Sequence, residues 1–395
     1  MNQLKILQVI PSLHTGGAER TAIDIGEAVL ERGWVSIVAS AGGRMVDQLT
    51  AGGSSHVTMP LDSKNPLTIW RNAARLVRLI KNQDINLIHA RSRAPAWSCL
   101  LAARRTGIPF VTTYHGAYNQ NSALKGLYNS VMARADTVIA NSQWTADLIV
   151  SRNPWAKDRI EVIHRGTDFE TFHLENIADN RLEKLRRQWT ITPDDIVIVQ
   201  LARLTTWKGQ GVVIKACAEL IKDFPHLKIV LAGDHQGRDE YLAGLQQKIE
   251  QHGLQGRIIL PGHCDDPAAA MAVADLVVVA SIEAEAFGRA AVEAGALEKP
   301  VIVTRIGAVG ETVLAPEDVD KDQFTGWKVT PGDAQDLAKT LRHCLSLSPD
   351  QRHLIGQRAR QHGQKNFSLR QMCSKTLTIY DKLLELKPAI QSPNA

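Results

Sequence analysis

The 395-residue sequence has no long apolar run and only five cysteines. No stretch reaches the roughly 18 apolar residues that a membrane-spanning helix requires. The apolar stretch from Ile6 to Ile10 is too short for the core of a secretion signal, and Pro11 interrupts it. The cysteines are odd in number and form no Cys-x-x-Cys pair, so neither a disulfide framework nor a zinc site is indicated. We therefore expect a cytoplasmic protein without a bound metal.

Two phosphate-binding fingerprints are also missing. Without G-x-x-x-x-G-K-[ST] a P-loop ATPase is not indicated, and without G-x-G-x-x-G a Rossmann dehydrogenase is disfavoured. The net charge of +5 is modest and no nucleic-acid-binding module is recognisable, so we expect no nucleic-acid partner. The basic excess lies in residues 1–170, with 19 Lys and Arg against 13 Asp and Glu, whereas the remainder has 27 against 28. This half either meets an anionic partner or carries its charges by random scatter.

Short apolar segments rich in Val and Ile alternate with segments of helical periodicity throughout the chain. Strands that are apolar on both faces are typical of buried parallel sheets, and the alternation predicts right-handed βαβ units. The expected strands of the first half are Lys5–Ile10, Val35–Ser40, Leu87–Ala90, Phe110–His115, Thr137–Asn141 and Ile160–Ile163. Those of the second half are Ile196–Ala202, Lys228–Gly233, Arg257–Pro261, Leu276–Ser281 and Pro300–Thr304. Helices are expected at Ala18–Arg32, Gly209–Lys222 and Asp239–His252, among others.

The strand series restarts after a polar stretch over residues 168–194, which indicates a boundary between two domains. The length of 395 residues also favours two hydrophobic cores over one. We predict an α/β fold with two doubly wound parallel sheets, an N-terminal Rossmann-like domain over residues 1–180 and a second over residues 181–367. In the tail, residues 368–395, a helix at Ser368–Leu386 can pack back on the N-terminal domain.

Polar residues just after a strand are site candidates, because ligands of open α/β sheets bind at the carboxyl ends of the strands. Gly16 and Gly17 follow the first strand and precede a helix, where they let a ligand approach the backbone or simply form a tight turn. His115 ends the strand that begins at Phe110, and it can donate to a sugar hydroxyl or a phosphate.

Two cations follow the strand Ile196–Ala202. Arg203 and Lys208 are five residues apart in a loop before a helix. There, an arginine can bind a diphosphate with two hydrogen bonds and a lysine can add a point charge. The loop is therefore either a diphosphate site or a solvated basic turn.

The strand Leu276–Ser281 leads into an acidic loop, a Phe-Gly turn and a helix of small residues. Free backbone N–H groups at the start of that helix suit a phosphate, whereas acidic residues early in a helix also stabilise it through its dipole. The candidate residues of this segment are Glu285, Phe287, Gly288, Arg289 and Glu293.

Two later loops contain further acidic residues. The Gly-rich loop after the strand Pro300–Thr304 contains Glu311, a further candidate at a strand end. Asp318 and Asp320 have the D-x-D spacing of a metal site, but they lie in a polar loop after Pro316, so we expect no metal there.

Together, these features resemble glycosyltransferase family 4, whose members are retaining enzymes with the GT-B fold of two Rossmann-like domains facing across a cleft. The resemblance covers nearly the whole chain. Its most specific parts are the Glu285-x7-Glu293 motif with its Phe-Gly turn and the Arg203…Lys208 pair. It implies a hexosyltransferase that binds a nucleotide sugar of the GDP or UDP type in its C-terminal domain and needs no metal or other cofactor.

The resemblance also implies roles for the matching residues. Arg203 and Lys208 would neutralise the diphosphate leaving group, and His115 would lie beside the sugar. Glu285 would bind the sugar hydroxyls and Glu293 the ribose, which makes His115, Arg203, Lys208 and Glu285 the expected catalytic residues. The remaining donor contacts would come from Gly16, Gly17, Phe287, Gly288, Arg289 and Glu311.

One segment departs from the family's pattern. His164-Arg165-Gly166-Thr167-Asp168 stands where members often have Asn-Gly-Val-Asp. This variant is similar to lipopolysaccharide-core mannosyltransferases and implies GDP-mannose as the donor and a lipid-linked core sugar as the acceptor. Two other functions stay open: a sugar-nucleotide epimerase on the same fold, and a nucleotide-sugar-binding protein without catalysis.

By the same resemblance, the acceptor would bind the N-terminal domain. Residues 65–83 form a basic amphipathic pattern, in which Trp70 and other apolar residues alternate with Arg71, Arg75 and further cations. Such a helix can lie on an anionic membrane surface, or it can pack on the sheet with a solvated basic face. The first alternative implies peripheral association with the cytoplasmic face of the inner membrane.

Overall fold

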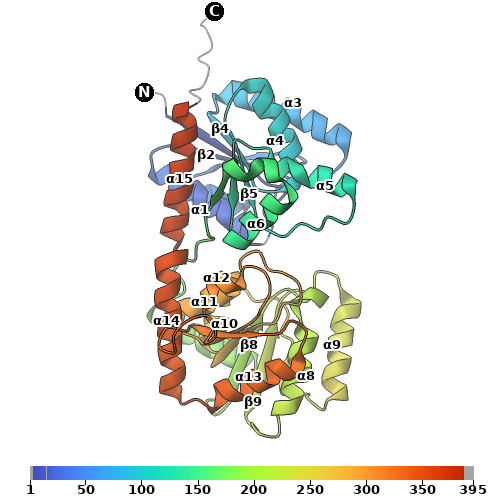
Figure 1. Ribbon diagram of the computed structural model, residues 1–395, viewed down its shortest axis with the longest axis vertical. Coiled ribbons are helices and arrows are strands. Elements are labelled where there is room, and N and C mark those ends of the chain that lie inside the picture. The colour runs from blue at the N-terminus through green and yellow to red at the C-terminus, as the bar shows by residue number, and fades with distance from the viewer. Residues whose placement is uncertain (1–2, 15, 387–395) are drawn as a thin grey trace, which may run out of the picture. The chain divides into compact units, whose positions relative to one another are not determined.

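The computed structural model describes residues 3–14 and 16–386. The chain divides into two compact units, one comprising Met1–Gly166 with Leu369–Ala395 and the other Thr167–Ser368. Each unit contains one parallel sheet flanked by helices, which is the expected α/β architecture (Figure 1). The first unit ends at Gly166 and not near residue 180, because Phe169, Phe172 and Ile177 pack into a core of the second unit.

The first unit contains a seven-stranded sheet in the order β3-β2-β1-β4-β5-β6-β7. All neighbouring strands are parallel, and Ile6, for example, lies opposite Leu87. The strands are β1 (Lys5–Val9), β2 (Val35–Ser40), β3 (Ser55–Thr58), β4 (Leu87–Ala90), β5 (Phe110–Tyr114), β6 (Thr137–Ala140) and β7 (Ile160–Val162). The sequence does not predict the edge strand β3, because Val57 is its only strongly apolar residue.

The helices and 3-10 turns of this unit are α1 (Gly17–Glu31), α2 (Val46–Ala51), α3 (Pro66–Gln83), α4 (Arg93–Thr106), α5 (Ala123–Asn129), η1 (Ser130–Ala133), α6 (Gln143–Arg152), η2 (Pro154–Arg159) and α15 (Leu369–Leu386). Helix α3 begins where the Asn65 side chain accepts from the Leu67 N–H at 2.9 Å, which satisfies one of the free donors of the first turn. Its Leu76 and Ile80, four residues apart, lie buried in the first-unit core. The apolar side of the predicted amphipathic helix is therefore partly covered.

The second unit contains a six-stranded parallel sheet in the order β10-β9-β8-β11-β12-β13. Its strands are β8 (Ile196–Leu201), β9 (Leu227–Ala232), β10 (Ile258–Ile259), β11 (Leu276–Val279), β12 (Val301–Thr304) and β13 (Gly326–Val329). Its helices and turns are η3 (Leu174–Asn176), α7 (Asp179–Gln188), η4 (Thr206–Lys208), α8 (Gln210–Leu220), α9 (Asp239–Gln251), α10 (Pro267–Ala272), α11 (Arg289–Ala296), α12 (Val309–Thr312), α13 (Ala334–Ser346) and α14 (Pro349–Phe367). The short strand β13 at the sheet edge is again one that the sequence does not predict.

Both faces of the second sheet are buried. In β8, Val197 and Val199 belong to one core cluster and Ile198 to another, because successive side chains of a strand point to opposite faces. A strand covered on both faces is mostly apolar, and a polar side chain within it, such as Gln200 of β8, makes a hydrogen bond inside the protein. This apolar character makes the central strands recognisable in the sequence. Their predicted ends differ from the observed ends by one or two residues.

The C-terminal helix α15 belongs to the first unit, where it packs against α1 (Figure 1). Its Tyr380 and Leu383 share a buried cluster with Ile6 of β1, and Arg32 Nη2 lies 2.6 Å from Asp381 Oδ2. Helix α15 therefore completes the core of the N-terminal domain.

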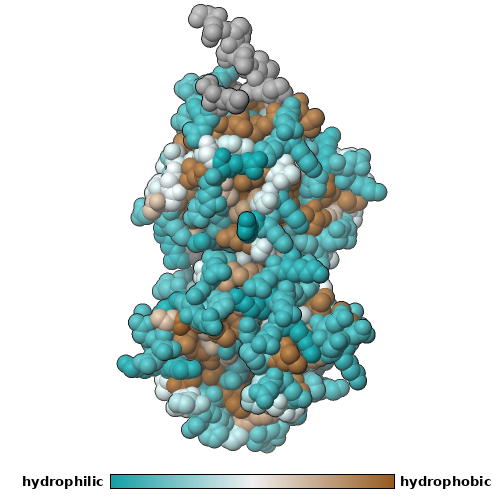
Figure 2. All heavy atoms as spheres, turned by 90° about the vertical axis from the view of Figure 1, so that its left-hand side faces the viewer, coloured by the Kyte–Doolittle hydropathy of each residue, from teal (hydrophilic) through white to brown (hydrophobic). Residues whose placement is uncertain are grey.

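A membrane span requires a helix of sufficient length and hydropathy. No helix within residues 3–14 and 16–386 is long and apolar enough to cross a bilayer. On the face drawn in Figure 2, hydrophobic residues are interspersed with hydrophilic ones, as is usual for folded proteins.

Candidate functional site

In the second unit, Lys208 and Glu285 form an ion pair between two loops that follow strands. Lys208 ends η4, after β8, and its Nζ lies 2.5 Å from Glu285 Oε1 in the loop after β11. Their side chains are only 15% and 12% exposed. The Ser281 hydroxyl also donates to Glu285 Oε1. The structure thus brings together two residues that are 77 positions apart in the chain and that the sequence predicts as site residues.

Two glycines allow the backbones of these loops to approach each other closely. Gly209 has a φ of 72°, and a Cβ atom there would overlap the carbonyl oxygen of Ala280 at the end of β11. Gly307, with a φ of 75°, lies equally close to the Glu285 backbone, and the Ala308 N–H donates to the Glu285 carbonyl at 2.8 Å. The position of Glu285 is therefore set by backbone contacts from β11 and from the loop after β12.

The loop that carries Lys208 is anchored at several points. Gln200 Nε2 donates to the Lys208 carbonyl at 2.6 Å, and Gln210 Nε2 donates to the Arg203 carbonyl at 3.0 Å. Lys208 Nζ lies 4.2 Å from the centroid of the Trp207 ring, a cation–π contact. The Arg203 side chain is exposed. The loop therefore presents two cations on a rigid backbone, one accessible and one held against Glu285.

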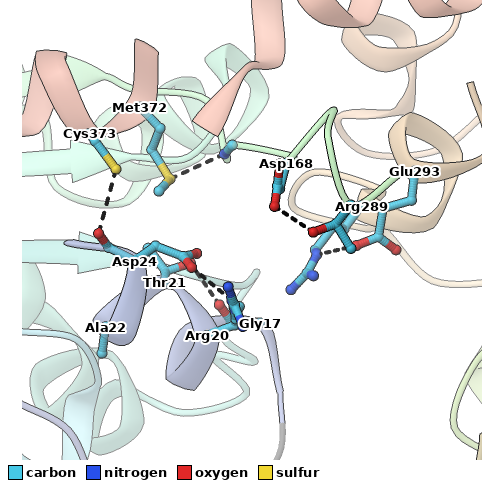
Figure 3. Close-up of polar contacts among 12 residues, drawn as sticks. Gly17, Arg20, Thr21, Ala22, Asp24, Asp168, Arg289, Glu293, Met372 and Cys373 are labelled. Carbon is cyan, nitrogen blue, oxygen red and sulfur yellow. Dashed lines mark hydrogen bonds and ion pairs between the residues drawn. The ribbon is translucent and has the colours of Figure 1, made fainter. Parts of the chain in front are cut away.

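Helix α11 carries the second acidic candidate. Gly288 precedes it in the left-handed conformation, with a φ of 79°. Arg289 and Glu293 lie one turn apart on the helix, with Arg289 Nε 2.6 Å from Glu293 Oε1, as Figure 3 shows. Glu293 is 7% exposed. Its carboxylate is a buried acceptor whose orientation Arg289 holds, and Phe287 lies in the core beneath this turn.

Two further acidic residues considered from the sequence, Glu311 and Asp318, lie after β12. Glu311 is part of the short helix α12, and its carbonyl lies 3.2 Å from His362 Nε2. Asp318 pairs with Lys328 and accepts from the Ala315 N–H at 2.8 Å. Within the residues that the structure describes, no three His, Cys, Asp or Glu side chains are grouped as a metal site.

In the first unit, the Gly-Gly turn leads directly into α1. Gly16 has a φ of 149°, and the Gly17 carbonyl accepts from the Thr21 hydroxyl at 2.7 Å. Arg20 Nε lies 2.7 Å from Asp24 Oδ1 on the same helix, as Figure 3 shows. These contacts secure the first turns of the helix behind the glycines.

His115 lies immediately after β5, as the sequence predicts, and contacts an arginine that the sequence does not single out. Arg165 Nη2 is 2.9 Å from His115 Nδ1. A Cβ atom on Gly17 would overlap the Arg165 guanidinium, so this side chain also lies over the start of α1. Burial, followed by the charges of Arg165 and Arg91, lowers the pKa of His115 well below its ordinary value. Gly17 and His115, two predicted site residues of the N-terminal domain, therefore both contact Arg165.

A buried polar network continues from this cluster through the sheet. Arg91, 2% exposed, follows β4 and donates from Nε to Gln8 Oε1 at 2.6 Å. His89 Nδ1 lies 2.6 Å from the Tyr380 hydroxyl, and its Nε2 lies 2.7 Å from the Thr113 hydroxyl. Arg91 was not singled out from the sequence, although the rule that sites lie at strand ends, applied to Leu87–Ala90, would have found it. Tyr380 could not be found this way, since it lies 291 residues beyond His89 along the chain.

Each of the two units therefore has its own set of polar groups. The second provides cations and a helix start suited to a diphosphate, together with carboxylates suited to hydroxyl groups. The first provides a neutral imidazole beside two guanidinium groups. The groups of the second unit alone can hold a nucleoside diphosphate and stabilise charge that develops on a departing diphosphate.

Comparison with known proteins places this chemistry in a family. Residues 15–171 match the model described as Glycosyltransferase Family 4, and residues 182–362 match that described as Glycosyl transferases group 1. A glycosyltransferase from Rickettsia africae is 34% identical and superposes with a TM-score of 0.88, over 98% of this chain and 100% of that one.

Two further relatives carry information on ligands. The Anabaena protein HepE, solved in complex with UDP and glucose, is 25% identical with a TM-score of 0.83, over 96% of this chain and 100% of that one. The D-inositol 3-phosphate glycosyltransferase of Saccharomonospora viridis is 28% identical over 75% of this chain and 69% of its own length.

Proposed function

This chain belongs to the family 4 glycosyltransferases, and we propose that it transfers a hexosyl group, with retention of configuration, from a nucleoside-diphosphate hexose to a hydroxyl group of a glycan or glycolipid. The observation that carries the proposal is the Lys208–Glu285 ion pair, because it joins a cation for the leaving group to an acceptor for sugar hydroxyls. Lysine has three N–H donors, so Lys208 can hold Glu285 with one of them and a phosphate oxygen with another.

The proposed chemistry needs no metal. When the bond between the sugar and the diphosphate breaks, negative charge grows on the phosphate and positive charge on the sugar. Arg203, Lys208 and the N–H groups that begin α11 would stabilise the phosphate in place of a cation. The acceptor oxygen forms the new bond to the sugar, and its proton passes to an oxygen of the departing diphosphate, which leaves with the electron pair of the broken bond.

The donor base and the acceptor are the finer parts of this proposal. The segment at residues 164–168 favours GDP-mannose and a lipopolysaccharide-core acceptor, whereas HepE binds UDP and glucose and the S. viridis relative is named for inositol 3-phosphate. We infer a nucleoside-diphosphate hexose, with GDP-mannose and UDP-glucose as the two donors to compare first.

A thermal-shift series with GDP, UDP and ADP, each with and without EDTA, tests the donor class. One nucleotide should raise the Tm, because a ligand at 100 times its Kd stabilises a protein by about 2.7 kcal/mol. EDTA should leave that shift unchanged. A shift that EDTA abolishes would contradict the metal-independent mechanism, and the absence of any shift would contradict the donor site.

Two other functions predict different products. A sugar-nucleotide epimerase would convert the donor without an acceptor, and a non-catalytic binder would leave both substrates unchanged. Product analysis with and without acceptor separates them from a transferase, which releases nucleoside diphosphate in step with acceptor glycosylation.

We also propose that the first unit binds an anionic membrane surface through α3 and α5, which would place the enzyme peripherally on the cytoplasmic face of the inner membrane. Residues 63–135 contain eleven Lys and Arg but a single acidic residue, Asp84. Four large apolar side chains on these helices are more than half exposed: Leu67, Trp70, Leu124 and Leu127. Anionic lipid attracts the charges, and the apolar side chains can enter the interface.

Helix α4 holds the two parts of this surface together. Its Ser98 hydroxyl donates to the Ile69 carbonyl of α3 at 2.9 Å, and its neighbour Trp97 donates from Nε1 to the Tyr128 carbonyl of α5 at 3.1 Å. Leu76 and Ile80 of α3 are buried in the core, so the lipid-facing set is limited to the first turns of α3 and to α5.

Vesicle flotation tests this surface. Wild-type protein should float with anionic vesicles and not with neutral ones. Replacing Arg71 and Arg75 with serine should weaken binding about 30-fold, since each surface cation contributes about 1 kcal/mol. The matched control is Leu354→Ser, which alters an exposed leucine of the second unit and should float as wild type does. Equal recovery with both vesicle types would refute the proposal.

A further inference from the structure

Arg165 connects two predicted site residues of the first unit. It follows β7, and its guanidinium lies over Gly17 at the start of α1, where a Cβ atom would displace it. Its Nη2 reaches His115 Nδ1, 2.9 Å away, after β5. A glycine at position 17 therefore makes room for the arginine, and the arginine contacts the histidine. This arginine belongs to the segment that departs from the family's usual Asn-Gly-Val-Asp.

The chemistry of this contact determines where the imidazole proton lies. An arginine guanidinium stays protonated in proteins and can only donate hydrogen bonds. His115 Nδ1 must therefore accept, which requires a ring nitrogen without a proton. The proton of a neutral His115 is then on Nε2, because a neutral imidazole donates from one nitrogen and accepts at the other.

The other ring nitrogen of His115, Nε2, is then a hydrogen-bond donor. His115 Nε2 is buried and contacts no hydrogen-bond partner among residues 3–14 and 16–386. A buried polar atom without a partner is costly, and such atoms are rare in folded proteins. Nε2 is thus suited to donate to an oxygen atom of a ligand.

The groups around His115 all disfavour its protonation. Arg165 and Arg91 carry positive charge, and His89 is a further titratable neighbour whose own pKa burial lowers well below the ordinary value. Tyr118 is also near, and burial raises its pKa, so its hydroxyl stays neutral. No carboxylate contributes to the lowered pKa of His115. A protonated His115 would have to place a third positive charge in this buried cluster.

We propose that Arg165 is a positioning residue that fixes His115 as a neutral imidazole with its proton on Nε2, so that His115 acts in the transfer as a hydrogen-bond donor and not as a base. Its ligand is an oxygen of the donor, either a sugar hydroxyl or a phosphate oxygen. This role rests on the proposed transferase function, but the protonation state of the ring can be measured without any turnover.

Nitrogen NMR of histidine-labelled full-length protein tests the proposal directly. The His115 signal is assigned by its loss in His115→Gln. In wild-type protein the proton should be on Nε2, and the ring should stay neutral at pH 7, because its pKa lies well below the ordinary value. In Arg165→Met the pKa of the ring should rise towards the ordinary value of about 6.5 without reaching it, because one opposing charge and the fixed hydrogen bond are gone while burial and Arg91 still lower the pKa. Arg159→Met, at an exposed arginine of the same unit, should leave the His115 signal unchanged.

Two further variants separate positioning from folding. Gly17→Ala should displace the guanidinium and reproduce the Arg165→Met spectrum without removing the charge from the chain. Arg165→Lys should restore part of the neutral state. In transferase assays, kcat for Arg165→Met should fall by roughly 10- to 100-fold, with the larger loss at pH 6 than at pH 8, since misplaced groups commonly cost this much.

The spectra test the role of Arg165, and the transfer assays test the proposed function. A proton on Nδ1 of His115, or titration of His115 near pH 6.5 in wild-type protein, would overturn the role of Arg165. The expected spectra together with no transfer from any nucleotide sugar would leave the tautomer assignment standing and contradict the proposed function.

Discussion

Replacing Lys208 with methionine should lower kcat/KM for the donor by roughly 10²- to 10³-fold, the usual cost of removing one group that stabilises developing charge. Methionine keeps most of the side-chain length but supplies neither charge nor an N–H donor. The loss should appear mainly in kcat, because the charge on the leaving group grows as the bond breaks. The fold should persist, since the Ser281 hydroxyl still donates to Glu285.

Replacing Glu285, the ion-pair partner of Lys208, tests whether the two residues act together. Glu285→Gln should also reduce kcat/KM, and the double variant should be less impaired than the sum of the two losses, because the residues act as one unit 2.5 Å apart. Lys222→Met, at an exposed lysine in the same unit, serves as the control and should be unaffected. Wild-type kcat/KM in Lys208→Met would remove this lysine from the site.

Gly209→Ala should destabilise the second unit by about 2–5 kcal/mol. The left-handed backbone, with a φ of 72°, costs a residue with a Cβ atom about 1–2 kcal/mol. The added methyl group would also overlap the Ala280 carbonyl oxygen, and overpacking of this kind costs about 1–3 kcal/mol. Calorimetry should show the Tm of the transition falling by roughly 5–15 °C.

A second glycine in the same helix region provides the matched control. At Gly211 in α8, a Cβ atom would meet only the Lys248 side chain at an ordinary 3.8 Å. Gly211→Ala should therefore be neutral or stabilise by up to about 1 kcal/mol, because alanine favours helix over glycine. Equal Tm values for the two variants would show that the close approach of η4 to β11 does not contribute to stability.

The parts of the site that follow strands were predictable from the sequence. A buried parallel strand is mostly apolar, so its end is marked where polar residues begin to recur, as they do from Arg203 after β8. The same reasoning identified His115, Lys208 and Glu285. Edge strands lack this signal: β3 and β13 lie at the ends of their sheets, and only the pairing of β3 with β2 and of β13 with β12 reveals them.

Contacts between distant segments were not predictable. Nothing in the residues near position 165 shows that this arginine reaches His115, because the contact depends on β5 and β7 lying on either side of β6 in one sheet. Likewise, Tyr380 meets His89 only because α15 returns to the N-terminal domain. Such contacts depend on chain topology, which local periodicity does not encode.

The sequence by itself determined the α/β class and the alternation of strands and helices, since both follow from local composition and periodicity, and the resemblance of its motifs to family 4 implied the glycosyltransferase family. The tertiary structure decided how the motif residues are paired: Lys208 with Glu285, Arg289 with Glu293, and Arg165 with Gly17 and His115. The physical reason is that hydrogen bonds and ion pairs require side chains to meet within about 3 Å. Except within a single helix, only the packing of sheets, loops and helices brings them that close.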